Sequence, residues 1–506
     1  MRYKVLRARA KQSDSIVNVF KSIYRVDRNL RILILFFICM AFSCALALLL
    51  PFGSPVLAIT MLLAIPGSYF ILLPEALVYR STFHINSKKY DSAKQLLARS
   101  LALSDRNPLA YINLGYLNML EGNFAQAQSD IAIAIEQNPK SSIAYLNQAA
   151  AAYYSGDYRA TIDSSRKALR LNASDKRANL NILISHYMRG DYQIVLELTE
   201  NPASFKQHRE SVLLVKLFTL LACGKLNSAE SYWAKTSCRY VDTKKIGSAA
   251  IASARENYSE AISMLTDIRP GQLIDGTGHI VRAIALSALG EPGLAYSTIS
   301  SNFERKLDHL SNFIVVSCIY HDCMMAKEGL DLLNKIEKSY NQSIGLQTQL
   351  ALLYTRENDF EKALSITSKV LENSPDQSQA INIHTICLAR TGHIEDANKW
   401  HKRQLAQEAQ FSLTQHADIH IKWACGKLDE ALNAAEKLLQ HDPNDLWSLK
   451  LKADLLDLFD DLSKRNLAKD IREQLSLLSI DRRKELQESM EKLPIEQLED
   501  LPLLPG

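Results

Sequence analysis

A turn-forming motif recurs along this 506-residue chain about every 34 residues, and it limits what the chain can fold into. The motif is usually a glycine followed by a polar and then an apolar residue. It begins at Gly122, Gly156, Gly190, Gly224, Glu256, Gly290, His321, Asn358, Gly392 and Gly426, with spacings of 34, 34, 34, 32, 34, 31, 37, 34 and 34. Thirty-four residues suffice for two helices but not for a separate core, so neighbouring units must stack. The pattern predicts an all-α array of helical hairpins.

A small residue follows each turn at a constant distance. Five positions after each turn start lie Ala127, Thr161, Val195, Ala229, Ala261, Ala295, Ala326, Ala363, Ala397 and Ala431, and eight of these ten are alanine. Such a position suits two helices that cross closely. Prolines at 139, 375 and 443 end second helices, and glycine and proline do not divide the chain into short strands.

One repeat has the residues typical of a known family at the expected spacing: Tyr111, Leu114, Gly115, Gly122, Phe124, Ala127, Ala134 and Pro139. The array resembles tetratricopeptide (TPR) repeats over roughly residues 76–460, with a partial repeat at Lys88-Lys-Tyr90. Leu183 and Leu217 depart from the small residue of the first helix, and repeat lengths change between 240 and 340. The resemblance implies a TPR α-solenoid superhelix with a concave groove.

We expect five segments along the chain. Residues 1–31 form a basic amphipathic cytoplasmic segment, and residues 32–75 form a transmembrane helical hairpin. About ten to eleven repeats occupy residues 76–445, capping helices occupy 446–492, and residues 493–506 form a flexible, acidic, proline-containing tail.

The TPR resemblance also implies which residues line the groove. In the first repeats these are mostly apolar: Ile112, Tyr116, Met119, Leu146, Tyr153, Leu180, Ile184, Tyr187, Leu214 and Phe218. In the later repeats they are polar or aromatic: Arg356, Asn382, Arg390, His416, His420 and Trp423. An amphipathic helix or an extended peptide is the expected occupant. The alternative is that tight superhelical winding, or the chain's own tail, buries these residues.

Residues 32–74 contain no charged side chain. Two apolar stretches, Ile32–Leu50 and Val56–Pro74, flank a turn that contains two prolines, and each is long enough to cross a bilayer. We therefore expect a hairpin in the lipid bilayer. A cleaved signal peptide is the rival interpretation, but a second full-length apolar stretch follows at once.

Basic residues predict the orientation of this hairpin. Residues 1–31 hold nine basic and two acidic side chains, a net charge of +7, and Arg80, Lys88 and Lys89 follow the second stretch. Basic flanks stay in the cytoplasm, so both termini and the repeats are expected there. Apolar residues at helical spacing within 15–30 indicate an amphipathic helix on the inner leaflet. A disordered flank and an organellar targeting peptide are the alternatives.

Few residues point to chemistry. Cys318, His321 and Cys323 form a short Cys/His cluster, but zinc usually needs four ligands in two close pairs. The sequence has no phosphate-binding glycine loop, dinucleotide fingerprint or nucleophile elbow. Residues 32–506 are mildly acidic, which gives nucleic-acid binding little electrostatic support. We expect no cofactor, no metal and no enzymatic activity.

The layout is similar to that of bacterial inner-membrane TPR proteins, namely the HemY-type proteins and the TPR subunit of Pel-type exopolysaccharide secretion. This resemblance implies a multi-pass protein of the bacterial inner membrane that recruits or assembles protein partners at its cytoplasmic face, for envelope or exopolysaccharide machinery. Two alternatives remain open: a metal-dependent or catalytic protein that uses Cys318, His321 and Cys323, and an organellar membrane assembly factor.

Overall fold

The computed structural model describes residues 73–200, 205, 208–266, 275–303, 309–407 and 412–493. Within these ranges every regular element is a helix, as the 34-residue period predicts. The basic segment 1–31, residues 32–72 of the expected hairpin and nearly all of the 493–506 tail lie outside them. In the described ranges no helix is both long and apolar enough to cross a bilayer.

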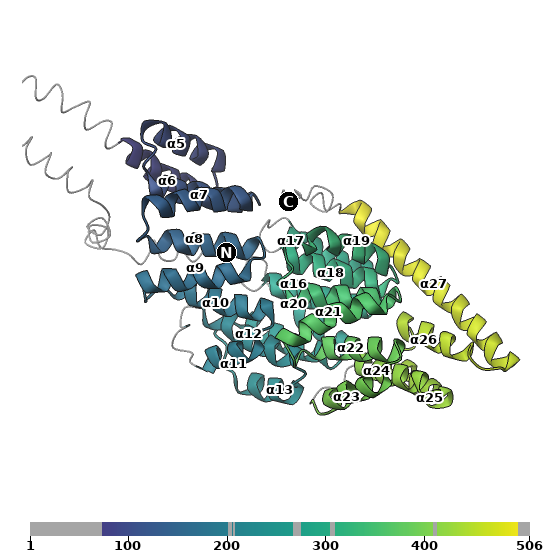
Figure 1. The fold of residues 1–506 in the computed structure, drawn as a ribbon. Helices are drawn as coiled ribbons and strands as arrows, with labels where there is room; N and C mark the ends of the chain where they lie inside the picture. Colours follow the sequence, from purple (N-terminus) through teal and green to yellow (C-terminus); the bar gives the residue numbers. More distant parts are fainter. Residues whose placement is uncertain are drawn as a thin grey trace, which may run out of the picture. The chain divides into compact units, whose positions relative to one another are not determined.

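Helices follow one another as antiparallel pairs joined by short turns (Figure 1). A helix over residues 73–86 pairs with α5 (Tyr90–Leu103). The next pairs are α6 (Pro108–Leu120) with α7 (Phe124–Gln137), α8 (Ser142–Tyr154) with α9 (Tyr158–Leu171), α10 (Lys176–Arg189) with α11 (Tyr192–Glu200), α12 (Arg209–Ala222) with α13 (Leu226–Lys235), and α14 (Val241–Ala254) with α15 (Tyr258–Leu265). They continue with α16 (Asp275–Ala288) and α17 (Pro292–Phe303), α18 (His309–Asp322) and α19 (Ala326–Glu337), α20 (Ile344–Arg356) and α21 (Phe360–Asn373), α22 (Ser378–Arg390) and α23 (Ile394–Leu405), and α24 (Ser412–Ala424) and α25 (Leu428–His441). The last two helices are α26 (Leu446–Leu456) and α27 (Leu462–Lys492).

The chain divides into two compact units, residues 1–147 and 148–506, with the boundary inside α8. In the first unit, Val78 and Ile85 of the 73–86 helix pack with Ala93, Leu97 and residues of α6. The second unit contains the larger core, which is centred on α16–α20.

The small residues of the sequence pattern lie where helices cross. The side chains at 127, 161, 195, 229, 261, 295, 363, 397 and 431 are all fully buried. A larger side chain at such a position would overlap the neighbouring helix, because the interior is close-packed. This part of the sequence interpretation is confirmed.

The turn expected at His321 was placed three residues too early. α18 continues to Asp322, and Met324 adopts the left-handed conformation (φ 56°) that Gly290 and Asn358 adopt in the adjacent repeats. The spacing is therefore a regular 34 residues on both sides. The small residue at this crossing is consequently Gly329, where a Cβ would lie 3.1 Å from a methyl group of Leu353. Methionine is rarely left-handed, so turn propensity alone pointed to the wrong residue.

The second unit winds back on itself. Tyr340 Oη donates to Tyr154 O (2.8 Å), Ser374 Oγ donates to Gly190 O (2.5 Å), and Ser412 N donates to Glu256 Oε1 (2.7 Å). Each of these bonds links a residue at or next to the turn within one hairpin to a residue at or next to the connection between two later hairpins. We call them the winding contacts. They join residues 156 to 186 positions apart, and they accompany the packing of α10 against α20.

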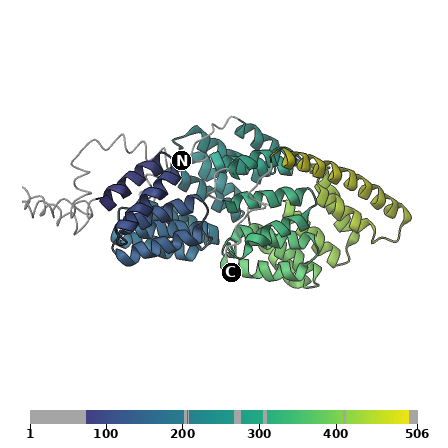
Figure 2. The same cartoon turned by 90° about the horizontal axis from the view of Figure 1, so that it is seen from above.

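The final helix, α27, has 31 residues and contacts two separate parts of the second unit (Figures 1 and 2). Its first half packs on α26, and its second half returns to α17. Arg482 donates to Asp322 O (3.0 Å) and Arg483 to Cys323 O (3.1 Å), while Glu485 Oε1 accepts from Gly293 N (3.1 Å). The helix thus ties the end of the array to the middle of the array.

Candidate functional site

None of the sixteen residues expected to line the groove is exposed. Six are buried, namely Ile112, Met119, Leu146, Leu214, Asn382 and His416, and the other ten are partly buried. The first three of these, together with Tyr116, belong to the first unit, and the rest belong to the second. Ten of these side chains therefore keep part of their surface accessible, and the other six do not.

The apolar positions largely contribute to the cores. Leu214 and Phe218 pack in a cluster with Trp233, Tyr153 packs against the largest cluster, and Leu180 and Tyr187 pack with Leu183. Burial raises the pKa of Tyr187 to about 12. These contacts agree with the alternative in which superhelical winding covers the apolar positions.

In the later repeats, polar and aromatic side chains form a network of hydrogen bonds and ring contacts with Trp447 at its centre. Arg356 Nε donates to His321 Nε2 (3.1 Å), and the guanidinium carbon lies 4.4 Å from the Trp447 ring centre. Trp447 Nε1 donates to His321 O (2.9 Å), and the imidazole and indole rings stack at 5.2 Å. A cation stacked on an aromatic face and held by hydrogen bonds is stabilised even when water is excluded.

These bonds define the tautomer and the charge of the His321 imidazole. Arginine nitrogens only donate, so Nε2 accepts and carries no proton. Nδ1 therefore carries the proton and donates to Asp322 Oδ1 at 2.7 Å. Burial lowers the pKa of His321, although Asp322 partly opposes this, so the ring is neutral near pH 7. Burial also lowers the pKa of Arg356 to about 10, which still leaves the guanidinium charged at neutral pH.

A similar stack lies one repeat further on. Arg390 is 34 positions after Arg356, and its guanidinium carbon lies 3.9 Å from the Trp423 ring centre. His420 stacks on the same tryptophan at 5.8 Å. Burial, and then the neighbouring His416, lower the pKa of His420 well below its ordinary value. This neutral histidine therefore sits beside an arginine that remains charged.

Asp445 connects the network to the first turn of α26. Its carboxylate accepts from the backbone N–H groups of Trp447 (3.3 Å) and Ser448 (3.1 Å), which caps the helix. His416 Nε2 lies 3.1 Å from Ser448 Oγ and 3.7 Å from Asp445 Oδ2. Burial alone would raise the pKa of Asp445, but the nearby imidazole of His416, hydrogen bonds from Ser448 and the charge of Arg356 hold this pKa well below its usual range.

Three fully buried side chains occupy the same repeat position on successive inner helices. They are Thr348 of α20, Asn382 of α22 and His416 of α24, each 34 residues from the next. Asn382 Nδ2 donates to Thr414 Oγ1 (3.1 Å). Among the residues that the structure describes, however, Thr348 Oγ1, Asn382 Oδ1 and His416 Nδ1 have no hydrogen-bond partner. A buried polar atom without a partner costs about 1–3 kcal/mol, so this unused hydrogen-bonding capacity requires an explanation.

The Cys/His cluster of the sequence is packed into the fold, with Cys323 fully buried and His321 hydrogen-bonded. Burial raises the pKa of Cys318 and of Cys323 to about 12. Both ring nitrogens of His321 already have partners. Across the described ranges, no group of three or more His, Cys, Asp or Glu side chains is arranged to hold a metal ion.

Sequence reasoning missed Trp447, Asp445 and Ser448. Asp445 is the last residue of the expected array, and Trp447 and Ser448 fall in the expected capping helices, so none of the three is among the expected groove residues. A usable signal was present, because an aspartate two residues before tryptophan and three before serine matches a helix N-cap. Their contact with His321 has no signal in the sequence, since the two segments lie 126 residues apart.

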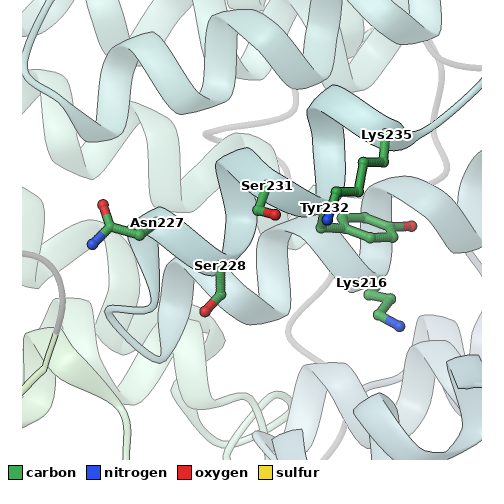
Figure 3. Close-up of a pocket in the computed structure, with 6 residues that line it drawn as sticks. All are labelled: Lys216, Asn227, Ser228, Ser231, Tyr232 and Lys235. Atoms are coloured by element: carbon green, nitrogen blue, oxygen red, sulfur yellow. The ribbon is translucent and has the colours of Figure 1, made fainter.

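A shallow cavity of about 530 Å³ lies on α12 and α13 (Figure 3). It is lined by Lys216, Asn227, Ser228, Ser231, Tyr232 and Lys235. Lys216 Nζ lies 5.2 Å from the Tyr232 ring centre, and burial raises the pKa of that phenol to about 12. The cavity is positively charged but open, and it shares no residue with the network around Trp447.

No known family model matches this chain, and no curated protein matches it. Among solved structures, the APC/C hetero-tetramer Cut9–Hcn1 matches 87% of this chain and 96% of its own at 13% identity, with a TM-score of 0.40. A structure of pilF from Pseudomonas aeruginosa matches 40% of this chain and 94% of its own at 16% identity (TM-score 0.33). Naa15/Naa10 bound to HypK-THB matches 85% of this chain and 78% of its own at 13% identity (TM-score 0.27). At these TM-scores the likenesses carry no argument about function.

Proposed function

We propose that this chain is a non-enzymatic scaffold that holds a protein partner in the interior of its second unit and is anchored to a membrane by residues 32–74. The observation that carries the proposal is the row of unpartnered polar atoms on Thr348, Asn382 and His416. An extended peptide presents one N–H and one C=O per residue and could satisfy such a row. An amphipathic helix suits it less, because the apolar positions already pack in the cores.

Charge supports an acidic or polar segment as the occupant. Arg356 and Arg390 each stack on a tryptophan, and arginine side chains stay charged at neutral pH. Guanidinium groups bind carboxylates through paired hydrogen bonds. The winding contacts and α27 restrict access, so the partner enters when they open or by threading between hairpins. Binding would then be slow but long-lived.

The membrane part of the proposal rests on residues 32–74 and their basic flanks. A tether confines the scaffold to the membrane plane and raises the effective concentration of a partner that is also membrane-bound. We place the protein in the bacterial inner membrane, with the repeats on the cytoplasmic side, where it would assemble envelope or exopolysaccharide machinery. N-terminal sequencing of the mature protein tests the organellar alternative, which requires a removed presequence.

The test replaces Asn382 with leucine in the full-length chain. Leucine has nearly the same volume and removes the unpartnered carbonyl, at the cost of one hydrogen bond to Thr414. We expect thermal stability within about 1 kcal/mol of the wild type, together with at least a tenfold loss of the partner recovered by photocrosslinking at Trp423. Crosslinking at Leu171, an exposed position of the same unit, is the background control. Undiminished recovery of the partner by the leucine variant would contradict the proposal.

A further inference from the structure

The helix over residues 73–86 has one face built into the first unit. Val78 and Ile85 are buried in the cluster with Ala93 and Leu97, and Ser100 Oγ donates to Pro74 O at 2.7 Å. This hydrogen bond attaches the end of the uncharged stretch directly to α5. The orientation of the helix relative to α5 and α6 is therefore set by buried contacts.

The opposite face of this helix exposes two large aromatic side chains. Tyr79 is 55% exposed and Phe83 is 69% exposed. Residues four apart lie on the same side of a helix, about 6 Å from each other. Arg80 is also exposed. An exposed pair of aromatic rings beside a basic residue is costly in water and typical of a surface that is covered in the working protein.

We propose that Tyr79 and Phe83 lie in the headgroup layer of a lipid bilayer, so that the 73–86 helix rests along the membrane surface. The inference depends on the proposed anchor, because residues 32–74 are uncharged and end only five and nine positions before these rings. At 1.5 Å per residue the rings lie about 8 and 14 Å along the helix from Pro74. The rings of Tyr79 and Phe83 therefore lie close to any bilayer that contains residues 32–74.

The chemistry of the helix favours lipid as the covering partner. Tyrosine and other amphipathic aromatic side chains concentrate at membrane interfaces, and basic residues are attracted by anionic lipids. Arg80, Lys88 and Lys89 are exposed, and they outnumber the acidic Glu75 and Asp91. The headgroup layer is only about 5–7 Å thick on each side. A helix standing upright would lift Phe83 out of this layer, so the helix must lie nearly flat.

Photocrosslinking in vesicles tests this surface. The full chain would be reconstituted into phosphatidylethanolamine–phosphatidylglycerol vesicles with a photoreactive phenylalanine at position 83. A control would carry the same group at position 143, because Ile143 of the same unit is 50% exposed and distant in sequence. We expect at least fivefold more lipid adduct at 83 than at 143. Equal lipid adducts at the two positions, or adducts at 83 only to protein, would overturn the inference.

Two further measurements test the proposed anchor and the proposed lipid-contacting surface independently of each other. Alkaline carbonate extraction reports on residues 32–74, so release of the wild-type chain would mean that the proposed anchor is wrong. The double variant Tyr79→Ser/Phe83→Ser should stay in the membrane fraction with an unchanged melting temperature. It should nevertheless be cut by trypsin at Lys88 or Lys89 several-fold faster, because the turn is no longer held against lipid. Ile143→Ser should leave this rate unchanged, and a double variant cut no faster than wild type would contradict the proposed surface.

Discussion

Two sets of turns in the second unit share one backbone geometry but differ in their surroundings. Gly156 and Gly190 have φ of 82° and 78°, and Gly392 and Gly426 have φ of 86° and 75°. A Cβ on Gly156 would overlap the carbonyl of Ser339, and one on Gly190 would overlap Ile344 and Ser374. A Cβ on Gly392 or Gly426 would meet no atom of the described residues within 4 Å.

The difference shows that one local motif has two roles. Every turn needs a left-handed residue, for which glycine is the least strained choice. Only the earlier turns also leave no room for a Cβ atom, because a later part of the chain lies against them. The winding contacts are thus formed at positions that look identical to the free turns in the sequence.

The largest expected effect comes from comparing alanine at the two kinds of turn. Gly392→Ala should lower the free energy of unfolding by about 1–2 kcal/mol, the cost of a left-handed alanine. Gly190→Ala carries the same strain plus overpacking, a further cost of about 1–3 kcal/mol. Denaturation of the two full-length variants in detergent, followed by circular dichroism, measures the difference. Equal losses would mean that the winding contacts contribute nothing to stability.

Low pH should lower the stability of the part of the second unit that contains the neutral histidines. Burial lowers the pKa of His384 from 6.5 to about 4, and burial also lowers the pKa of His321, His401 and His420. Below pH 6.5 the unfolded chain binds protons that these folded-state rings do not, so stability falls as the pH decreases. For His384 alone the loss between pH 6.5 and 4 is on the order of 3 kcal/mol.

Unfolding measured between pH 7.5 and 4.5 checks this expectation. The variant His384→Gln keeps a hydrogen-bonding side chain near Thr367 and should show a shallower pH dependence than the wild type. An unchanged slope would show that His384 does not titrate as proposed.

The smallest expected effect concerns the corrected turn. Met324 is left-handed (φ 56°), so Met324→Gly should relieve backbone strain and raise the free energy of unfolding by up to about 1 kcal/mol. Packing lost with the methionine side chain would reduce this gain. Asn358→Gly at the equivalent turn should change stability little, because asparagine tolerates this conformation. The melting temperatures of the two variants provide the comparison. A clear loss at Met324→Gly with none at Asn358→Gly would show that the methionine side chain outweighs its backbone strain.

Much of the fold could be predicted because its determinants are local. The 34-residue period, the small residues at helix crossings and the turn glycines each depend on neighbours within one or two hairpins. The error at His321 arose where a local rule failed. The core holds Ile319 and Cys323 fully buried, so the helix extends to Asp322 and the left-handed position falls on a methionine.

The candidate site was predicted only in part. Arg356, Arg390, His420 and Trp423 were named from repeat positions, and the structure gives each of them an aromatic or cationic partner. The sequence did not show that Trp447 would join Arg356 and His321, or that none of the sixteen positions would be exposed.

The amino-acid sequence alone predicts an array of helical hairpins, the 34-residue recurrence of its turns and, except around His321, the small residues at the crossings. The three-dimensional packing sets which turns are covered, where the array contacts itself and which of the described polar groups lack partners. The cause is the sequence separation over which the interactions act. Helix periodicity and turn conformation act over a few residues, whereas the winding contacts join residues 156 to 186 positions apart, and the small rotations between successive hairpins add up to bring them together.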